Sequence, residues 1–278
     1  MAQPKLSRRD FLKAAGSGAA ALVATSGAGM AAASVARTVL ANGPHPGDPG
    51  AGNQRWVMVI DLARCDGCGE CTEACNAMHM VPPGQEWIKV YKMQHDALRV
   101  TGSHFFPRPC MQCDNPPCVN VCPVGASYKR EDGIVLIDQD LCIGCRFCLA
   151  ACPYSARYFN WAEPPHTAQE LSQPYSVETN IPHRRGVAEK CLFCPALTRQ
   201  GQLPACGSAC PKGAIYFGDE HEDAVTNGLG ETYRLSELLA EGGAHRHLEE
   251  LGTEPRVWYL PPRKISAPSA EGSESSEG

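Results

Sequence analysis

The sequence predicts an α+β fold in which short strands and helices surround inorganic centres instead of a large organic core. Three observations support this prediction. Aromatic residues make up only 7% of the 278 residues, a thin supply for a core of this size. The chain has 16 cysteines, far above ordinary usage. These cysteines fall into four groups of four with closely similar internal spacing.

The charge of the chain is nearly balanced. It has 25 Lys and Arg against 30 Asp and Glu, whereas domains that track nucleic-acid phosphates concentrate basic charge on one face. The sequence also has no G-x-G-x-x-G fingerprint, P-loop or nucleophile elbow. We therefore expect no nucleic-acid partner, no nucleotide-dependent chemistry and no small-molecule substrate of its own.

The N-terminal segment, residues 1–41, has the pattern of a twin-arginine export signal. Arg8 and Arg9 stand before an apolar residue, and an uncharged run rich in Ala, Gly and Ser follows. Because Gly and Ser leave this run less hydrophobic than a membrane-spanning helix, we expect cleavage after Ala41 or Ala36, with retention as an anchor as the alternative. This route exports folded proteins that already hold their cofactors, so we expect a periplasmic protein.

The cysteine spacing is the strongest signal in the sequence. The first and third groups read C-x2-C-x2-C-x3-C, which is typical of bacterial ferredoxins. The second group opens the middle gap to four residues and the fourth to eleven, and both keep C-x2-C at the front and C-x3-C at the back. The groups are Cys65, Cys68, Cys71 and Cys75; Cys110, Cys113, Cys118 and Cys122; Cys142, Cys145, Cys148 and Cys152; and Cys191, Cys194, Cys206 and Cys210.

This spacing suits a cube of iron and sulfur. Three closely spaced cysteines can bind three irons of one cube, while the amides of the tight loop point at the cluster and stabilise its negative charge. Gly67, Gly69 and Gly144 permit the close backbone approach that such loops need. The fourth cysteine of a group rides on a short helix and binds the other cluster of a pair. We therefore expect four [4Fe-4S] clusters.

The residue after the last cysteine differs between the groups. Proline follows it in three groups, as Pro123, Pro153 and Pro211, where it turns the chain. Asn76 takes this place in the first group. The geometry after Cys75 is therefore less well predicted than that of the other groups.

Two other uses of cysteine compete with clusters. An exported protein with an even number of cysteines invites disulfides, but cysteines two residues apart in repeated triplets are poor partners for each other. Zinc is the stronger alternative, because Cys191-x2-Cys194 with Cys206-x3-Cys210 could by itself form a four-cysteine zinc site. A mixed-metal protein is therefore a further alternative.

The predicted helices and strands are short. Runs rich in β-branched and aromatic residues predict strands over residues 56–61, 86–93 and 215–218. We expect helical turns that carry the fourth cysteines over residues 69–78 and 146–151.

A β-hairpin is expected between the second and third cysteine groups. Its strands would cover residues 126–131 and 134–138, joined by a two-residue turn at Asp132-Gly133. This hairpin would join the two halves of one ferredoxin-like unit.

Beyond these patterns, the chain resembles a known family. The segments that carry the resemblance are FFPRPCMQCDNPPCVNVCPVGAS, GIVLIDQDLCIGCRFCLAACPY and KCLFCPALTRQGQLPACGSACPKGAI. They resemble the four-cluster iron-sulfur subunits of molybdenum or tungsten bis-pterin oxidoreductases and of related quinone-linked complexes. Among these are the electron-transfer subunits of DMSO, tetrathionate and polysulfide reductases and of the formate-dependent nitrite reductase system. The resemblance covers residues 55–220 and is weaker over 160–190.

The resemblance implies a nested set of ligands. The first cysteine group would pair with the fourth and the second with the third, giving two ferredoxin-like units related by duplication. Some relatives replace one ligand by Trp and hold a three-iron cluster, but Cys118 keeps that place here. The implied ligands are Cys65, Cys68, Cys71 and Cys210 for cluster 1; Cys75, Cys191, Cys194 and Cys206 for cluster 2; Cys110, Cys113, Cys118 and Cys152 for cluster 3; and Cys122, Cys142, Cys145 and Cys148 for cluster 4.

The nested ligands also imply boundaries within the chain. The first unit would combine residues 55–109 with 186–225, and the second would cover 110–159. Residues 160–185 would form an inserted docking loop. Residues 226–278 would form a C-terminal extension, whose Ser-, Glu- and Gly-rich tail is expected to be disordered.

A row of one-electron centres transfers electrons between two partners and needs no catalytic site of its own. The resemblance implies a quinone-interacting membrane subunit on one side and a catalytic oxidoreductase subunit on the other, with this chain peripheral to the membrane. Two alternatives are a free-standing periplasmic polyferredoxin and an enzyme with a labile-iron cluster. Complete motifs in all four groups count against the second of these.

Other charged and polar residues carry weaker signals. Eight cations lie near the cysteine groups in the sequence and could raise cluster potentials, but solvated surface charge is the more frequent role of such residues. No histidine pair has the spacing of a metal site, so no histidine is assigned a role. The eight cations are Lys92, Lys129, Arg146, Arg157, Arg184, Arg185, Lys190 and Lys212.

Overall fold

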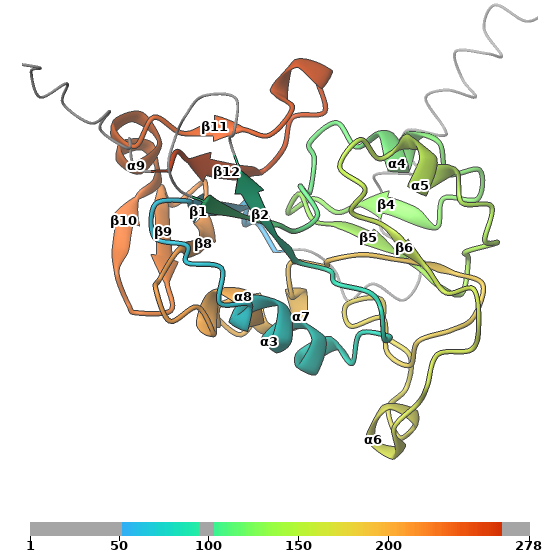
Figure 1. The fold of residues 1–278 in the computed structure, drawn as a ribbon. Coiled ribbons are helices and arrows are strands. Elements are labelled where there is room, and N and C mark those ends of the chain that lie inside the picture. The colour runs from blue at the N-terminus through green and yellow to red at the C-terminus, as the bar shows by residue number, and fades with distance from the viewer. Residues whose placement is uncertain (1–51, 95–102, 263–278) are drawn as a thin grey trace, which may run out of the picture.

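The computed structural model describes residues 52–94 and 103–262, and its largest element is a six-stranded sheet (Figure 1). Strand β1 (Trp56–Asp61) lies inside the sheet, antiparallel to β8 (Ile215–Asp219) and parallel to β12 (Val257–Leu260). These bounds confirm two of the predicted strands. The outer strands are β9 (Ala224–Asn227), β10 (Thr232–Arg234) and β11 (His245–Arg246), in the order β10-β9-β8-β1-β12-β11.

The C-terminal segment completes this sheet. Val257 and Tyr259 on β12 are fully buried, and helix α9 (Leu235–Glu241) packs beside β10. The 3-10 helix η2 (Glu249–Leu251) precedes β12. The segment predicted as an extension is therefore integral to the sheet as far as Leu260, and the predicted disordered tail lies outside the described residues.

Three helices lie below the sheet in the view of Figure 1 and carry or adjoin cysteines of the first and fourth groups. Helix α3 (Glu70–His79) packs against α8 (Ala205–Ser208), and α7 (Pro195–Thr198) begins directly after Cys194. Helix α3 confirms the helix predicted over 69–78. It starts after Gly69, whose φ of 87° is a conformation that glycine adopts without strain.

A hairpin and two short helices form a second region, on the right in Figure 1. Strand β4 (Ser127–Lys129) pairs antiparallel with β5 (Val135–Ile137). Helix α4 (Pro117–Asn120) contacts α5 (Phe147–Ala151), which confirms the predicted helix over 146–151.

The turn of this hairpin differs from the prediction. The amide of Arg130 donates to the carbonyl of Ile134 at 2.8 Å, so the loop has three residues, from Glu131 to Gly133. Gly133, with a φ of 83°, is the left-handed residue that closes such a loop. The Asp-Gly pair is thus a correct turn signal, but the predicted two-residue turn is wrong by one residue.

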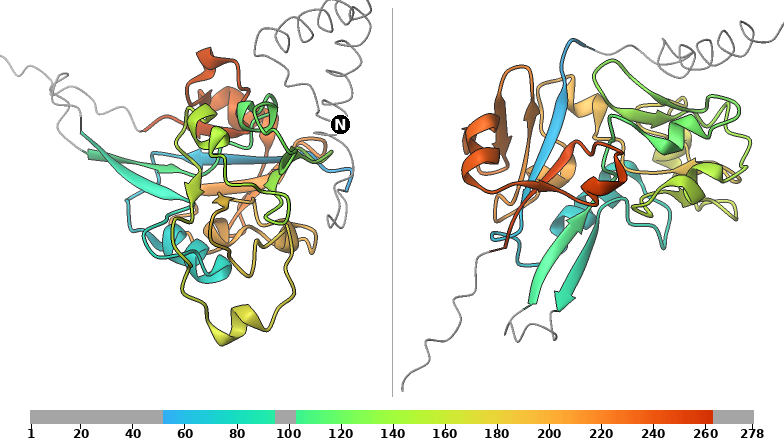
Figure 2. Two further views of the ribbon diagram at one scale, coloured as in Figure 1. Left: turned by 90° about the vertical axis from the view of Figure 1, so that its right-hand side faces the viewer. Right: turned by 90° about the horizontal axis from the view of Figure 1, so that it is seen from above.

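Strands β2 (Lys89–Gln94) and β3 (Ser103–Arg108) form a separate antiparallel ribbon, which extends away from the body of the molecule in the right-hand view of Figure 2. The strand predicted over 86–93 is therefore shifted towards the C-terminus. The chain bends at Trp87 and Ile88, and both adjacent side chains are buried. This breaks the in-out alternation of a strand.

The inserted segment leaves the body of the molecule and returns to it. Strands β6 (Tyr158–Phe159) and β7 (Ala188–Glu189) pair at its base, and helix α6 (Ala168–Leu171) lies at its projecting tip in Figures 1 and 2. His183 is nevertheless only 2% exposed. Part of the insert therefore packs on the core.

One apolar core connects the sheet with the hairpin region. It contains Met58 from β1, Tyr128 from β4, Leu136 from β5 and several cysteines. The backbone amide of Trp56 also donates to the carbonyl of Asp132 at 3.3 Å. Among the helices that the structure describes, none has both the length and the apolarity needed to cross a membrane.

Candidate metal centres

The first site is a small cavity surrounded by sulfur ligands from two distant cysteine groups. Cys65, Cys68 and Cys71 come from the loop and helix start after β1, and Cys210 comes from the turn after α8. All four line one cavity of about 20 Å³. Burial raises the pKa of the Cys71 thiol to about 12, so this thiol ionises only beside strong positive charge, which iron supplies.

Glycines shape the loops of these sites, as the sequence predicts. Gly67 and Gly69 line the first cavity with φ values of 79° and 87°. A Cβ at residue 67 would lie 2.2 Å from the ring of Phe105 on β3, and one at Gly144 would lie 2.4 Å from the carbonyl oxygen of Gly186. A side chain at 67 or 144 would therefore have to displace a neighbour as well as adopt a strained φ.

The second site is deeper than the first. Its thiols come from α3, from the loop that leads into α7, and from α8, and all four are buried. Burial is the largest cause of their raised pKa values, to about 11 for Cys191 and about 12 for Cys194. Cys75 and Cys206 each interact with both of these thiols, and burial raises their pKa values well above the usual one.

The third site combines the second cysteine group with the last member of the third. Burial, and then the neighbouring Cys110, raise the pKa of Cys113, with smaller contributions from Cys118 and Cys152. Cys152 in turn interacts with Cys110 and Cys118. These are the four residues of the predicted third set.

The fourth site lies at the loop before α5. Cys142 and Cys145 belong to this loop, and Cys148 lies on α5. Burial raises the pKa of Cys148, which interacts with Cys118 and Cys142. Cys122 follows α4, which packs against α5.

At two of the sites, a backbone amide donates a hydrogen bond to a cysteine sulfur. The amide of Ser127 donates to the Sγ of Cys122 at 3.4 Å, and the amide of Ala214 donates to the Sγ of Cys210 at 3.3 Å. In both cases a proline turn separates the cysteine from the donor. Amide donors to a cysteine sulfur favour its ionised, metal-binding form.

The donor set fits iron-sulfur clusters. Across residues 52–94 and 103–262, no three His, Cys, Asp or Glu side chains meet at a point where one metal ion could bind. At the first site, four thiols instead line the walls of a cavity. Soft thiolate ligands arranged around a volume match the requirement of a cube that holds several irons.

A buried histidine contacts a cysteine of the second site. The sequence does not predict this contact. The Nε2 atom of His79 lies 3.1 Å from the Sγ of Cys194. Burial, and then the neighbouring His183, lower the pKa of His79 to about 4. His183 is held between the carbonyl oxygen of His79, at 2.8 Å, and the carboxylate of Glu189, at 2.7 Å. No spacing in the sequence pairs these histidines, because the insert and α3 meet only in the fold.

Two of the eight cations near the cysteine groups are buried rather than solvated. Lys190 has no exposed surface, and its Nζ donates to the carbonyl oxygens of Val135 and Cys191. Arg157 is 6% exposed. The predicted role as solvated surface charge is therefore wrong for these two residues. The prediction is correct for four other residues, which are exposed: Lys92, Arg146, Arg185 and Lys212.

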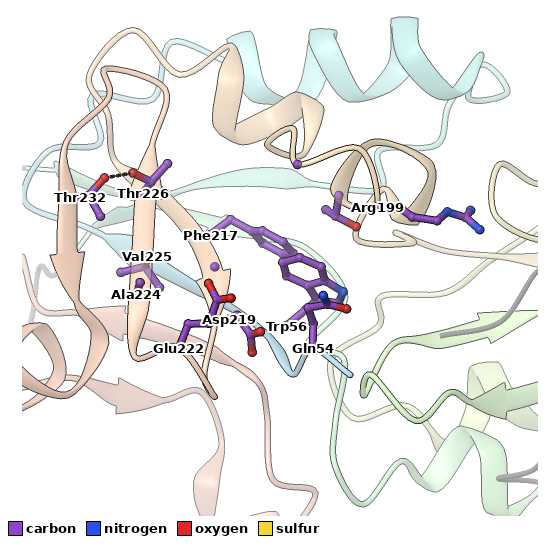
Figure 3. A pocket seen from close by; sticks show the side chains of 13 residues that line it. Gln54, Trp56, Arg199, Phe217, Asp219, Glu222, Ala224, Val225, Thr226 and Thr232 are labelled. Atoms are coloured by element: carbon purple, nitrogen blue, oxygen red, sulfur yellow. Dashed lines mark hydrogen bonds between the residues drawn. The ribbon is translucent and has the colours of Figure 1, made fainter. Parts of the chain in front are cut away.

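A larger surface pocket of about 330 Å³ lies near the second site (Figure 3). The rings of Trp56 and Phe217 stack in it with centroids 5.4 Å apart. Phe193, between the cysteines of the Cys191-x2-Cys194 loop, meets Phe217 edge-on at 5.3 Å. Aromatic packing thus connects this pocket with the loop of the second site.

Comparisons with known protein families agree with this geometry. Two models of the 4Fe-4S dicluster domain match the chain, one over residues 56–126 and 141–214 and the other over residues 101–169. A model of the twin-arginine translocation pathway signal sequence matches residues 5–25. This match confirms the export signal predicted from Arg8 and Arg9, which lie outside the described residues.

Similar proteins include iron-sulfur subunits of reductases. A selenate reductase subunit of Mesobacillus selenatarsenatis is 42% identical, covering 74% of this chain and 72% of the relative. The iron-sulfur cluster-binding subunit of menaquinone reductase from Nitratidesulfovibrio vulgaris is 38% identical, covering 76% and 90%. A tetrathionate reductase subunit of Salmonella typhimurium is 34% identical, covering 91% and 88%.

These matches extend over all four cysteine groups. They confirm four [4Fe-4S] clusters as the cofactors, against the zinc and disulfide alternatives, and they confirm an α+β chain with tandem dicluster domains. The chain therefore belongs to the family of 4Fe-4S dicluster proteins, as an exported iron-sulfur electron-transfer subunit of the kind found in these reductases.

Proposed function

We propose that this chain relays electrons between a quinone-linked membrane subunit and a catalytic oxidoreductase subunit, and that it has no catalytic centre of its own. The observation that carries this proposal is the position of the two outermost cysteine loops. The loop with Cys68 lies on the left in Figure 1 and the loop before α5 on the right. Cys68 is exposed and Cys145 is partly exposed. The thiols of the second site are buried, and Cys191 there interacts with Cys110 of the third site, so an electron could enter on one side and leave on the other.

We propose as cluster ligands the four nested cysteine sets that the family resemblance implies. Interactions between Cys65, Cys71 and Cys210 support the first set, and the shared cavity supports it further. The packing of α3 against α8 supports the exchange of fourth cysteines between the first and last groups. The packing of α4 against α5 supports the same exchange in the second region.

We also propose that two ferredoxin-like units, residues 55–109 with 186–225 and residues 110–159, arose by duplication. Each has an antiparallel strand pair, β8 with β1 or β4 with β5, and a pair of packed short helices. Each also has an amide contact to the last cysteine of one group in which proline follows, Cys210 or Cys122.

Exposed apolar side chains support a docking role for the third cysteine group and for the insert, residues 160–185. Ile143 and Phe147 beside this group are 64% and 60% exposed, and Trp161 is 67% exposed. The guanidinium of Arg146 lies 4.6 Å from the centroid of the Trp161 ring, which joins the insert to this loop. Clustered exposed apolar side chains are typical of protein interaction sites. In this proposal the docked chain is periplasmic and is held at the membrane through its partners.

The pocket in Figure 3 gives no support to a catalytic role. The carboxylate of Asp219 accepts hydrogen bonds from the amides of Arg55 and His221, at 2.8 and 3.0 Å. Arg199 is paired with Glu178. These polar groups are therefore engaged in holding the fold rather than free to act on a substrate.

Co-purification tests the proposal against a free-standing polyferredoxin. A tagged chain expressed in its native host should elute with a catalytic and a membrane subunit, whereas a diffusing carrier elutes alone. Trp161→Ser combined with Phe147→Ser should weaken recovery of a partner without loss of iron. Leu229→Ser, at an exposed apolar residue of the β9–β10 turn, is the matched control. Elution of the wild-type chain alone, loaded with iron, would contradict the proposal.

A further inference from the structure

Arg157 is a buried cation without a carboxylate partner. It is 6% exposed, and its Nη1 atom donates to the hydroxyl of Ser127 at 2.8 Å. Its Nη2 atom is buried and has no hydrogen-bond partner. Among the residues that the structure describes, no Asp or Glu pairs with this guanidinium. A buried, unpaired charge costs several kcal/mol unless an opposite charge lies nearby.

Arg130 provides the contrast within the same region. Its side chain is equally buried, at 7% exposure, but it pairs with the carboxylates of Asp132 and Glu178 at 2.6 and 2.7 Å. The fold therefore supplies carboxylates to one buried arginine and none to the other. The charge of Arg157 must be balanced by something other than an acidic side chain.

The groups around Arg157 are cysteines. Burial alone would lower its pKa, but Cys118, Cys148, Cys110 and Cys152 raise it to a net value above the usual one. The charge of Arg157 in turn opposes the rise that burial causes in the pKa of Cys148. Ser127, its other partner, donates its backbone amide to the Sγ of Cys122.

These cysteines belong to two different proposed clusters. Cys110, Cys118 and Cys152 are proposed ligands of cluster 3, and Cys148 and Cys122 of cluster 4. A cluster with four thiolates is anionic and becomes more anionic when it accepts an electron. A fixed cation between two such clusters stabilises the reduced form of each. No proton moves, since arginine keeps its charge throughout.

We propose that Arg157 is the shared counter-charge of clusters 3 and 4, and that its charge raises the reduction potentials of both. With both clusters bound, the guanidinium would favour the reduced form of each by its fixed positive charge. The inference rests on the proposed ligand sets, and it assigns a positioning role to Arg157, not a catalytic one.

Three variants test the role of Arg157 in the purified complex, by redox titration followed by electron paramagnetic resonance. Arg157→Gln removes the charge but keeps a donor for Ser127, and it should lower the midpoint potentials of two clusters only. Arg157→Lys keeps the charge and should recover most of the shift. Arg130→Gln, at the arginine whose charge is already neutralised, should leave all four potentials unchanged.

Loss of clusters is also informative. If Arg157→Gln lacks the iron of clusters 3 and 4 while Arg157→Lys retains it, the charge is required for loading, and the proposal is supported. Equal behaviour of the two Arg157 variants, or a shift spread evenly over four clusters, would overturn it. Absence of four cluster signals from the wild-type protein would instead contradict the proposed function itself.

Discussion

The Nε2 atom of His79 contacts the Sγ of Cys194 at 3.1 Å, across 115 residues of sequence. This contact depends on the residue after Cys75. Where proline follows the last cysteine, as at Cys122, Cys152 and Cys210, the helix has ended and the chain turns. Asn76 is not a proline and lies inside α3, where its carbonyl oxygen accepts from the amide of Met80, so α3 continues to His79 and brings the imidazole to the second site.

We expect His79→Phe to lower the midpoint potential of the cluster held by the second set of cysteines. A sulfur that binds iron can only accept, so Nε2 must donate, and this bond is stronger to the reduced cluster. A difference of about 1 kcal/mol corresponds to roughly 40 mV for one electron. Redox titration with electron paramagnetic resonance measures it. His79→Gln retains an N–H donor and should recover part of the shift, and a potential unchanged by His79→Phe contradicts the role.

The metal content of the anaerobically purified protein should be roughly sixteen irons per chain, because four cubes hold four irons each. Zinc should be nearly absent. Metal analysis by mass spectrometry, together with acid-labile sulfide, measures both. One zinc per chain with about twelve irons would mean that one cysteine group, such as the fourth, binds zinc.

Elements of the fold can be predicted where the residues that determine them are close together in the sequence. The cysteine triplets fix the loops, and Gly69 and Gly144 have the positive φ that the loops require. The apolar run of β1 identifies a strand that is buried on both faces. Each of these depends on residues that are close together in the sequence.

The remaining features depend on contacts between distant segments. Strand β12 is only four residues long and pairs with β1 across about 200 residues, so no local pattern reveals its place in the sheet. Arg157 has the sequence neighbourhood of a surface arginine and is buried by the hairpin, through Ser127. A single sequence carries no signal for such pairings.

The C-terminal strand should be important for stability. Val257 is fully buried on β12, so Val257→Ala removes two carbons from the core and should cost about 2 kcal/mol. The loss of cluster absorbance during heating, at one fixed heating rate, measures the effect. Val124→Ala, at a residue 39% exposed, is the matched control and should change little. Equal melting of the two variants would mean that β12 is not part of the core.

Export should depend on the arginine pair of the signal. Arg8→Lys combined with Arg9→Lys should leave cluster-loaded protein in the cytoplasm, because the pair is read by the translocation machinery. Immunoblots of cytoplasmic and periplasmic fractions measure the distribution. Arg184→Lys combined with Arg185→Lys changes another arginine pair of the chain and should not affect it. Unchanged periplasmic accumulation of the first variant would contradict the assignment.

The last prediction tests the nested ligands. If each cysteine group bound its own cluster, Cys75→Ser would alter the cluster held by Cys65, Cys68 and Cys71. The structure favours a different result, because Cys75 lies more than one turn into α3 and interacts with Cys191 and Cys194. Cys210 lines the cavity of the first triplet instead. We therefore expect Cys75→Ser to disturb the second cluster.

Spectra of the reduced variants separate the two arrangements. Cys68→Ser identifies the signal of the first cluster and Cys194→Ser that of the second, since each lies inside a C-x2-C pair whose assignment is the same in both models. With nested ligands, Cys75→Ser alters the signal that Cys194→Ser alters, and Cys210→Ser alters the one that Cys68→Ser alters. If Cys75→Ser and Cys68→Ser alter one signal while Cys194→Ser alters another, each group binds its own cluster. The packing of α3 against α8 would then have to be explained without shared ligands.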